Sequence, residues 1–91
     1  MALKTGAVFL AEQLEAYGVT HVFMVPAILR RTLVEIEMRT KIKRLHVHSE
    51  KSAVYMADGF ARAADRPAIC MAQVIGALNI AAGLREPFLA N

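Results

Sequence analysis

The carboxylate of Glu50 is the side chain of greatest chemical interest in this 91-residue sequence. It lies between a predicted buried strand, residues 42–48, and the start of an apolar helical pattern, where side chains are partly desolvated. Burial disfavours a charged carboxylate, whereas the positive end of a helix stabilises it. Glu50 could therefore exchange protons with a ligand or could simply complement the helix dipole, and residue spacing alone leaves both interpretations open.

Other reactive side chains lack the partners that their chemistry needs. His46 and His48 alternate along one predicted strand and so share a face, but no third ligand accompanies them and no metal site is predicted. Ser49, Ser52 and Cys70 lack the base and orienting group of a nucleophilic site. The sequence contains no glycine-rich dinucleotide motif and no Walker A motif, so neither kind of nucleotide site is supported.

Helices and strands are predicted to alternate on both sides of Glu50. Apolar side chains recur at helical spacing in four segments, residues 3–17, 29–36, 50–64 and 76–84. Residues 19–25 are a short run of β-branched and aromatic residues, which predicts a strand buried on both faces. Two further buried strands are predicted, at residues 42–48 and 68–72. Thr5 and Gly18 are residue types that begin and end a helix, and Pro87 is expected to end the last one.

This order predicts the α/β fold class, with a three-layer, doubly wound parallel sheet. Strands joined by helices must run parallel, and the crossovers between them are right-handed. Ligands of such sheets bind beyond the carboxyl ends of the strands. Three loops lie at that edge, residues 25–27, 48–50 and 73–76, so any site is expected there.

The end of the sequence is interpreted as an unfinished sheet. Three parallel strands leave two unpaired edges, and such sheets normally contain more strands. Residues 85–91 are predicted to be the approach to a fourth strand. Residues 1–91 are therefore expected to be the front part of one domain.

The composition fits a chain that forms a core. Apolar residues make up 56% of it and charged residues 21%, so disorder is not predicted. Because Cys70 is the only cysteine, no internal disulfide can form, which suits a reduced, cytoplasmic location. No apolar run approaches the roughly 18 residues of a membrane span and the first residues lack a secretory signal, so no membrane partner is expected.

Basic residues are concentrated in one segment, residues 30–51. This basic segment holds seven Lys and Arg residues against three Glu, within a net charge of +3. It could attract a phosphate-bearing partner, which gives the alternative of a short, non-catalytic α/β binding module. Stacking aromatic residues and nucleic-acid-binding motifs are not found beside it, so a nucleic-acid partner is not expected.

Three motifs follow one another along the chain. The first is Gly-Val-x-x-Val-Phe-x-Val-Pro at residues 18–26. The second places Glu50 before Ala-Asp-Gly-Phe-Ala-Arg-Ala at residues 57–63, and the third is Gly-Ala-x-Asn-x-x-x-Gly-Leu at residues 76–84. Together they resemble the N-terminal pyrimidine-binding domain of thiamine-diphosphate-dependent enzymes, in the group of acetolactate synthases, benzaldehyde lyases and 2-keto acid decarboxylases.

The resemblance implies roles for individual residues. In that family, the glutamate at the Glu50 position hydrogen-bonds the N1′ nitrogen of the cofactor's aminopyrimidine and so promotes formation of the C2 ylide, which attacks a 2-keto acid. Pro26 and Ala27 would line the cofactor pocket, and Gly76 with Asn79 would shape the loop beside it. The implied activity is that of a decarboxylase or carboligase, a lyase or a transferase.

The resemblance also implies parts of the site beyond these residues. In that family, Mg²⁺ and the diphosphate are held by a diphosphate-binding domain of a neighbouring subunit, so a homodimer or homotetramer is expected and this segment alone is expected to be inactive. A second alternative is one subunit of a split decarboxylase. Several positions depart from the family pattern and argue against acetolactate as the product: Met24 and Ala27 replace glycines, Ser49 replaces a histidine, and Val74-Ile75 replaces Gly-Pro.

Overall fold

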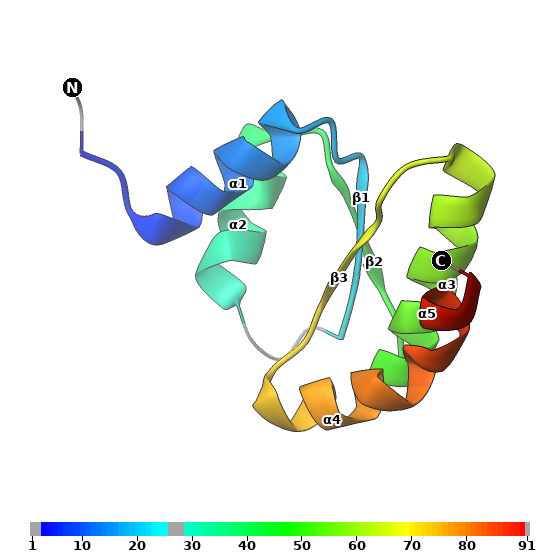
Figure 1. Ribbon diagram of the computed structural model, residues 1–91. Coiled ribbons are helices and arrows are strands. Elements are labelled where there is room, and N and C mark those ends of the chain that lie inside the picture. Colours follow the sequence, from blue (N-terminus) through cyan, green and yellow to red (C-terminus); the bar gives the residue numbers. More distant parts are fainter. Residues whose placement is uncertain (1–2, 26–28, 91) are drawn as a thin grey trace.

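The computed structural model describes residues 3–25 and 29–90, in which helices and strands alternate up to the last two helices (Figure 1). None of the helices described is both long and apolar enough to span a bilayer. The strands are β1 (His21–Met24), β2 (Lys43–His46) and β3 (Ile69–Met71). The helices are α1 (Gly6–Ala16), α2 (Arg30–Arg39), α3 (Glu50–Ala64), α4 (Val74–Gly83) and α5 (Arg85–Ala90).

The strands form a parallel sheet in the order β2-β1-β3. In this register, Phe23 of β1 lies opposite Leu45 of β2 and Cys70 of β3. The chain thus passes from the central strand to one neighbour and then to the other, as in doubly wound sheets. Helices α1 and α2 lie on one side of the sheet and α3 on the other, which confirms the predicted three-layer α/β class (Figure 1).

Each face of the sheet has its own apolar core. Side chains alternate along β1, so Val22 and Met24 pack toward α1 and α2, whereas Phe23 packs toward α3. The remaining buried members of the two cores are Ala11, Leu33, Ile36 and Ile42 on the first face and Val47, Ala53 and Ala57 on the second. The central strand is therefore buried on both faces, as its sequence predicts.

Helix α1 begins and ends as its residue types predict. The Thr5 hydroxyl accepts a hydrogen bond from the Val8 amide at 3.2 Å, which satisfies one of the free amides of the first turn. Gly18 has a φ of +85°, in the left-handed region that glycine adopts without steric penalty, and its amide donates to the Glu15 carbonyl. This turn directs the chain from α1 into the central strand.

The C-terminal part of the chain differs from the prediction. Residues 85–90 form helix α5 rather than the approach to a strand. Pro87 lies in the first turn of α5, where the missing amide costs no helix bond, so it does not end α4. Helix α4 begins at Val74, two residues earlier than predicted, so Gly76 is the third residue of the helix and not its first.

Strands β2 and β3 are less buried than predicted. In β2, Lys43 and His46 are exposed and the two residues between them are half-buried. All three residues of β3 are half-buried rather than fully buried. Each strand lies at an edge of the sheet, and no strand covers its outer side within the residues that the structure describes. An edge strand receives less cover than the central one, which explains the difference.

Candidate functional site

Glu50 is the first residue of α3 and lies at the carboxyl edge of the sheet. The chain leaves β2 at His46 and reaches Ser49, which is the N-cap of α3. The Ser49 hydroxyl accepts a hydrogen bond from the Ser52 amide at 3.2 Å and so fixes the backbone where the helix begins. Glu50 is thereby held, half-buried, at the positive end of a helix.

Gly76 lies directly against the Glu50 carboxylate. It is buried near the start of α4, which lies beyond the carboxyl end of β3 (Figure 1). A Cβ atom on Gly76 would lie 2.6 Å from Oε2 of Glu50, 2.7 Å from its Cγ and 2.8 Å from its Cδ. No side chain fits there unless Glu50 moves, so glycine permits this close approach of α3 and α4.

Asn79, one turn further along α4, makes a hydrogen bond to Glu50. Its side-chain Nδ2 donates to Oε1 at 3.1 Å. Within residues 3–25 and 29–90, Oε2 accepts no hydrogen bond and Glu50 forms no ion pair. One oxygen of the carboxylate is therefore held by an amide, while the other has no partner among these residues.

Cys70 adds an electrostatic effect that the sequence did not indicate. It lies in the middle of β3, half-buried beside the core that faces α3. Burial raises the pKa of the Cys70 thiol, and the negative charge of Glu50 raises it further. This effect depends on how α3 packs on the sheet, and residue spacing carries no signal for it.

Three of the five residues predicted to bind cofactor are in contact with one another. Gly76 and Asn79 both touch Glu50, and both lie within helix α4 rather than in the loop predicted beside the cofactor pocket. Pro26 and Ala27 lie outside the described residues. The signal in the sequence is the i, i+3 spacing of Gly76 and Asn79, because such residues share one face of a helix.

His46 and His48 are predicted to lie on one strand, but in the structure they do not. His46 is the last residue of β2 and His48 lies beyond it, and both are exposed. In the part of the chain that the structure describes, no three side chains of His, Cys, Asp or Glu gather where they could hold a metal ion.

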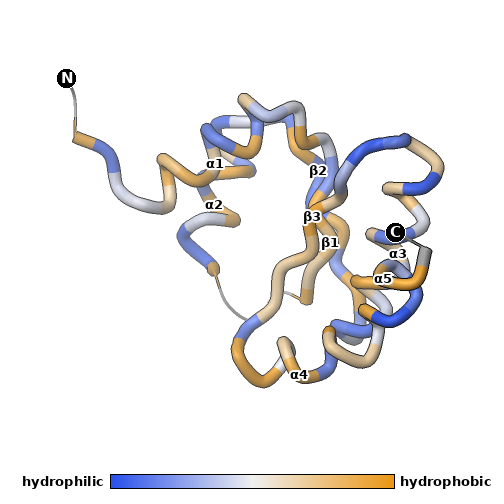
Figure 2. Tube along the Cα trace, viewed as in Figure 1, coloured by the Kyte–Doolittle hydropathy of each residue, from blue (hydrophilic) through white to orange (hydrophobic). Residues whose placement is uncertain are grey.

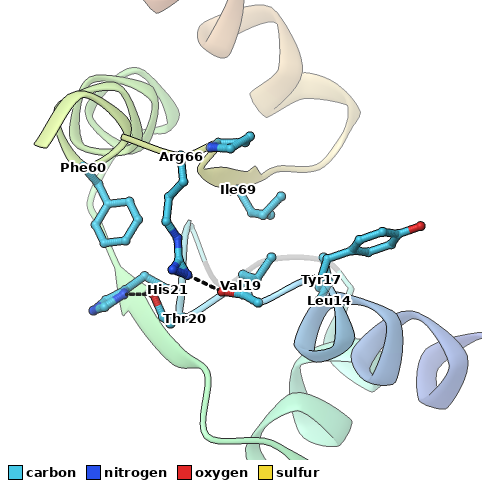
Figure 3. Close-up of a pocket in the computed structure, with 10 residues that line it drawn as sticks. Leu14, Tyr17, Val19, Thr20, His21, Phe60, Arg66 and Ile69 are labelled. Atoms are coloured by element: carbon cyan, nitrogen blue, oxygen red, sulfur yellow. Dashed lines mark hydrogen bonds between the residues drawn. The ribbon is translucent and has the colours of Figure 1, made fainter. Parts of the chain in front are cut away.

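A cavity of about 320 Å³ lies at the opposite, amino edge of the sheet (Figure 3). Arg66 reaches across it and donates a hydrogen bond to the Gly18 carbonyl. The rings of His21 and Phe60 lie 4.8 Å apart on its wall. None of the residues around Glu50 lines this cavity, so it is distinct from the candidate site.

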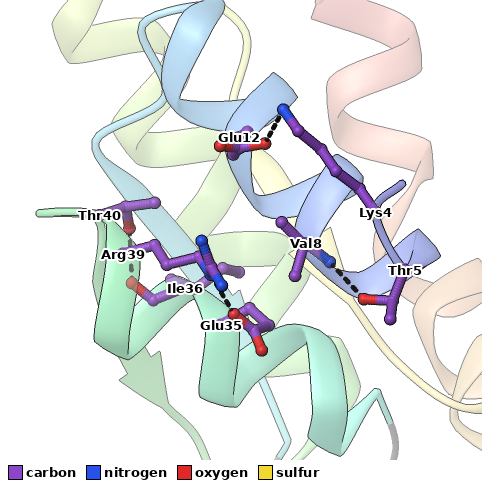
Figure 4. A network of polar contacts seen from close by, with 8 residues as sticks. All are labelled: Lys4, Thr5, Val8, Glu12, Glu35, Ile36, Arg39 and Thr40. Atoms are coloured by element: carbon purple, nitrogen blue, oxygen red, sulfur yellow. Dashed lines mark hydrogen bonds and ion pairs between the residues drawn. The ribbon is translucent and has the colours of Figure 1, made fainter. Parts of the chain in front are cut away.

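The basic segment is partly neutralised by neighbouring carboxylates. Arg39 pairs with Glu35 at 2.5 Å within α2 (Figure 4), and Arg44 pairs with Glu37 at 3.2 Å. Outside this segment, the ammonium group of Lys4 donates a hydrogen bond to Glu12 of helix α1 at 2.6 Å and lowers the pKa of that carboxyl. The segment is therefore a less continuous positive surface than its sequence suggests.

Comparison with known proteins identifies a family for this chain. Residues 4–91 match the profile of a family described as thiamine pyrophosphate enzyme, N-terminal TPP binding domain. An acetolactate synthase of Arthrospira platensis is 32% identical over 90 residues, which cover 93% of this chain and 16% of that protein. The chloroplastic acetolactate synthase of Arabidopsis thaliana is 33% identical over 88 residues, which cover 94% of this chain and 13% of that protein.

The chain therefore spans about 13–16% of the length of these relatives. Acetolactate synthase 1 of Nicotiana tabacum, also chloroplastic, is 34% identical over 88 residues, with 94% and 13% of the two chains covered. No solved structure matches this chain at a significant level.

Proposed function

This chain belongs to the thiamine pyrophosphate enzymes, as their N-terminal cofactor-binding domain, and we propose that Glu50 is its catalytic residue in an acetolactate synthase-like reaction on 2-keto acids. One observation carries the proposal: Asn79 holds Oε1 of Glu50, while Oε2 has no partner among the described residues. A carboxylate held in this way can share a proton with a ring nitrogen of a bound ligand.

The surroundings of Glu50 suit the aminopyrimidine end of thiamine diphosphate. Gly76 gives the carboxylate room to lie against α4, at the edge of the sheet where doubly wound folds bind ligands. When bound, the cofactor supplies a nucleophilic thiazolium carbon and an electron sink for the loss of carbon dioxide from a 2-keto acid. Glu50 contributes by holding a proton at the N1′ nitrogen of the ring.

The exposed side of α4 supports a partner domain next to this site. Val74, Ile75 and Leu78 are 72–80% exposed, and α4 contains no charged residue. Figure 2 shows hydrophobic residues over much of this helix. A helix that is apolar on all sides is normally buried, so this side of α4 is expected to be covered in the assembled protein.

We assign the apolar side of α4 to a diphosphate-binding domain of a neighbouring subunit. Most of the length of the relatives lies outside the part that they share with this chain. Such a domain would hold Mg²⁺ and the diphosphate group, complete the site beside Glu50 and produce a homodimer or homotetramer.

The test compares two variants of the protein as isolated from its source, here called the native protein. Glu50→Gln removes the negative charge of the carboxylate and keeps its shape. With thiamine diphosphate, Mg²⁺ and a panel of 2-keto acids, its release of carbon dioxide is expected to fall by about 10²–10⁴-fold, the usual effect of removing a proton-transfer group.

Glu37→Gln is the matched control. Glu37 is exposed on α2, which lies on the opposite side of the sheet from α3 (Figure 1), so this variant is expected to keep native turnover. Near-native turnover in Glu50→Gln, with the cofactor fully bound, would remove Glu50 from the mechanism.

A further inference from the structure

The hydrogen bond between Asn79 and Glu50 joins two helices that are distant in sequence. The donor Nδ2 and the acceptor Oε1 are 3.1 Å apart and belong to residues separated by 29 positions. Asn79 is exposed, so its side chain is not held in place by burial. The hydrogen bond itself therefore determines where the amide lies.

The partner that holds Glu50 is a neutral amide, as is the Lys41 backbone amide that donates to Glu15. Among residues 3–25 and 29–90, four other acidic side chains instead form ion pairs with Lys or Arg: Glu12, Glu35, Glu37 and Asp58. A cation beside Glu50 would stabilise its charge and oppose proton uptake. The Asn79 amide restrains the carboxylate without adding any net charge.

We infer that Asn79 is a positioning residue that holds Oε1 of Glu50 and so presents Oε2 to the ligand; this inference rests on the function proposed for Glu50. Two neighbours support the same orientation. Ser49 fixes the backbone at the start of α3, and Gly76, which has no side chain, leaves room for the carboxylate against α4. Without the amide, the carboxylate rotates about its side-chain bonds, and a smaller fraction of molecules has Oε2 in the productive position.

The experiment measures two quantities in the native protein with Mg²⁺ present: the affinity for thiamine diphosphate, by calorimetry without substrate, and turnover. Asn79→Leu removes the donor at similar size, and Asn79→Gln keeps an amide on a longer chain. We expect Asn79→Leu to weaken binding and lower turnover by about 10- to 100-fold, the effect of losing a hydrogen bond to a charged group. Asn79→Gln is expected to recover part of this loss.

A double variant separates positioning from a general effect on the fold. If Asn79 acts through Glu50, adding Asn79→Leu to Glu50→Gln weakens thiamine diphosphate binding no further, because the two residues form one unit. Additive losses would overturn the inference. Should Asn79→Leu fail to fold, Asn79→Ala serves in its place, since alanine is favourable at an exposed helical position.

The outcomes also distinguish this inference from the proposal on which it rests. Native binding and turnover in Asn79→Leu, together with an inactive Glu50→Gln, would overturn the positioning role alone. An active Glu50→Gln would overturn the proposed function, and the positioning role with it.

Discussion

A methyl group on Gly76 would lie 2.6 Å from Oε2 of Glu50, closer than side-chain atoms approach in real structures. The contact joins α4 to the first residue of α3. Because the neighbouring atoms belong to the flexible end of a side chain rather than to backbone, Glu50 can move aside without disturbing the helices. Gly76 therefore determines where the carboxylate lies more than it determines the stability of the helix pair.

The variant Gly76→Ala is expected to fold and to lose the site. Alanine is favoured over glycine in a helix by about 1 kcal/mol, which offsets the displacement of Glu50. We expect the free energy of unfolding to stay within about 1 kcal/mol of the native value. Thiamine diphosphate binding and turnover are expected to fall by about 100-fold, as for misplacements of about 1 Å. Denaturant unfolding and calorimetry measure the two effects.

Gly59→Ala is the matched control for this substitution. Gly59 is exposed in α3, and an added Cβ would meet no atom within 4 Å. The variant is expected to gain about 1 kcal/mol of stability and to bind the cofactor normally. Equal losses of cofactor binding in the two variants would show that Gly76 has no special part in positioning Glu50.

Gly83 is the second glycine at which α3 and α4 meet, and its neighbours there are a buried side chain and a backbone carbonyl rather than the flexible end of a side chain. An added Cβ would lie 3.0 Å from Cβ of Val54 and 3.4 Å from the Lys51 carbonyl oxygen. Val54 is only 4% exposed. Gly83→Ala is therefore expected to lower the free energy of unfolding by about 1–3 kcal/mol, as overpacked sites do. A denaturation midpoint at or above that of the native protein would contradict this account.

Local signals predict much of the fold because their causes are local. The hydroxyl of Thr5 and the positive φ of Gly18 each determine one end of helix α1 through contacts within a single turn. The apolar run of β1 indicates that this strand is buried between two layers. Residues 85–90 carry no such signal. A short segment with Pro87 near its start is compatible with a loop before a strand or with the first turn of a helix, and packing decides between them.

The candidate site is less predictable, because it depends on distances between elements. The topology places Glu50 and Gly76 at the same edge of the sheet, and the sequence is sufficient for that step. That Gly76 and Asn79 touch Glu50 itself depends on how closely α4 approaches α3. Periodicity within each helix gives the face that a residue occupies, but it cannot give the separation of two helices.

The variant Leu78→Asp tests the face of α4 that we assign to a partner domain. Leu78 is 78% exposed, so a charge there disturbs no core of this chain. The dissociation constant of the proposed oligomer is expected to rise by about 10- to 100-fold, as for a residue central to an interface. Sedimentation velocity measures the change, and the fully exposed Leu3, as Leu3→Asp, is the control. An unchanged oligomer in Leu78→Asp would place the interface elsewhere.

The reactivity of the Cys70 thiol can be used to measure the effect of the charge on Glu50. Burial raises the pKa of its thiol and the Glu50 carboxylate raises it further, so the thiolate is scarcer at a given pH than in a small-molecule thiol. Alkylation of Cys70 by iodoacetamide is therefore expected to be slower than alkylation of free cysteine. In Glu50→Gln the alkylation rate should increase, because the negative charge is removed. It should stay below the rate of free cysteine, because the burial of Cys70 remains. Equal alkylation rates in this variant and the native protein would show that the charge of Glu50 does not affect the Cys70 thiol.

The raised pKa of Cys70 also fixes the sign of a stability change with pH. As the pH rises, the thiol loses its proton in the unfolded state before it does so in the folded state. The contribution of Cys70 to the free energy of unfolding is therefore complete below the unfolded pKa of about 8.5 and is lost as the pH passes the higher, folded pKa. Cys70→Ala lacks this contribution. The advantage of the native protein over Cys70→Ala in free energy of unfolding should therefore shrink from about pH 7 to about pH 10. An advantage that stays constant or grows over this range would mean that the folded thiol does not titrate above the unfolded one.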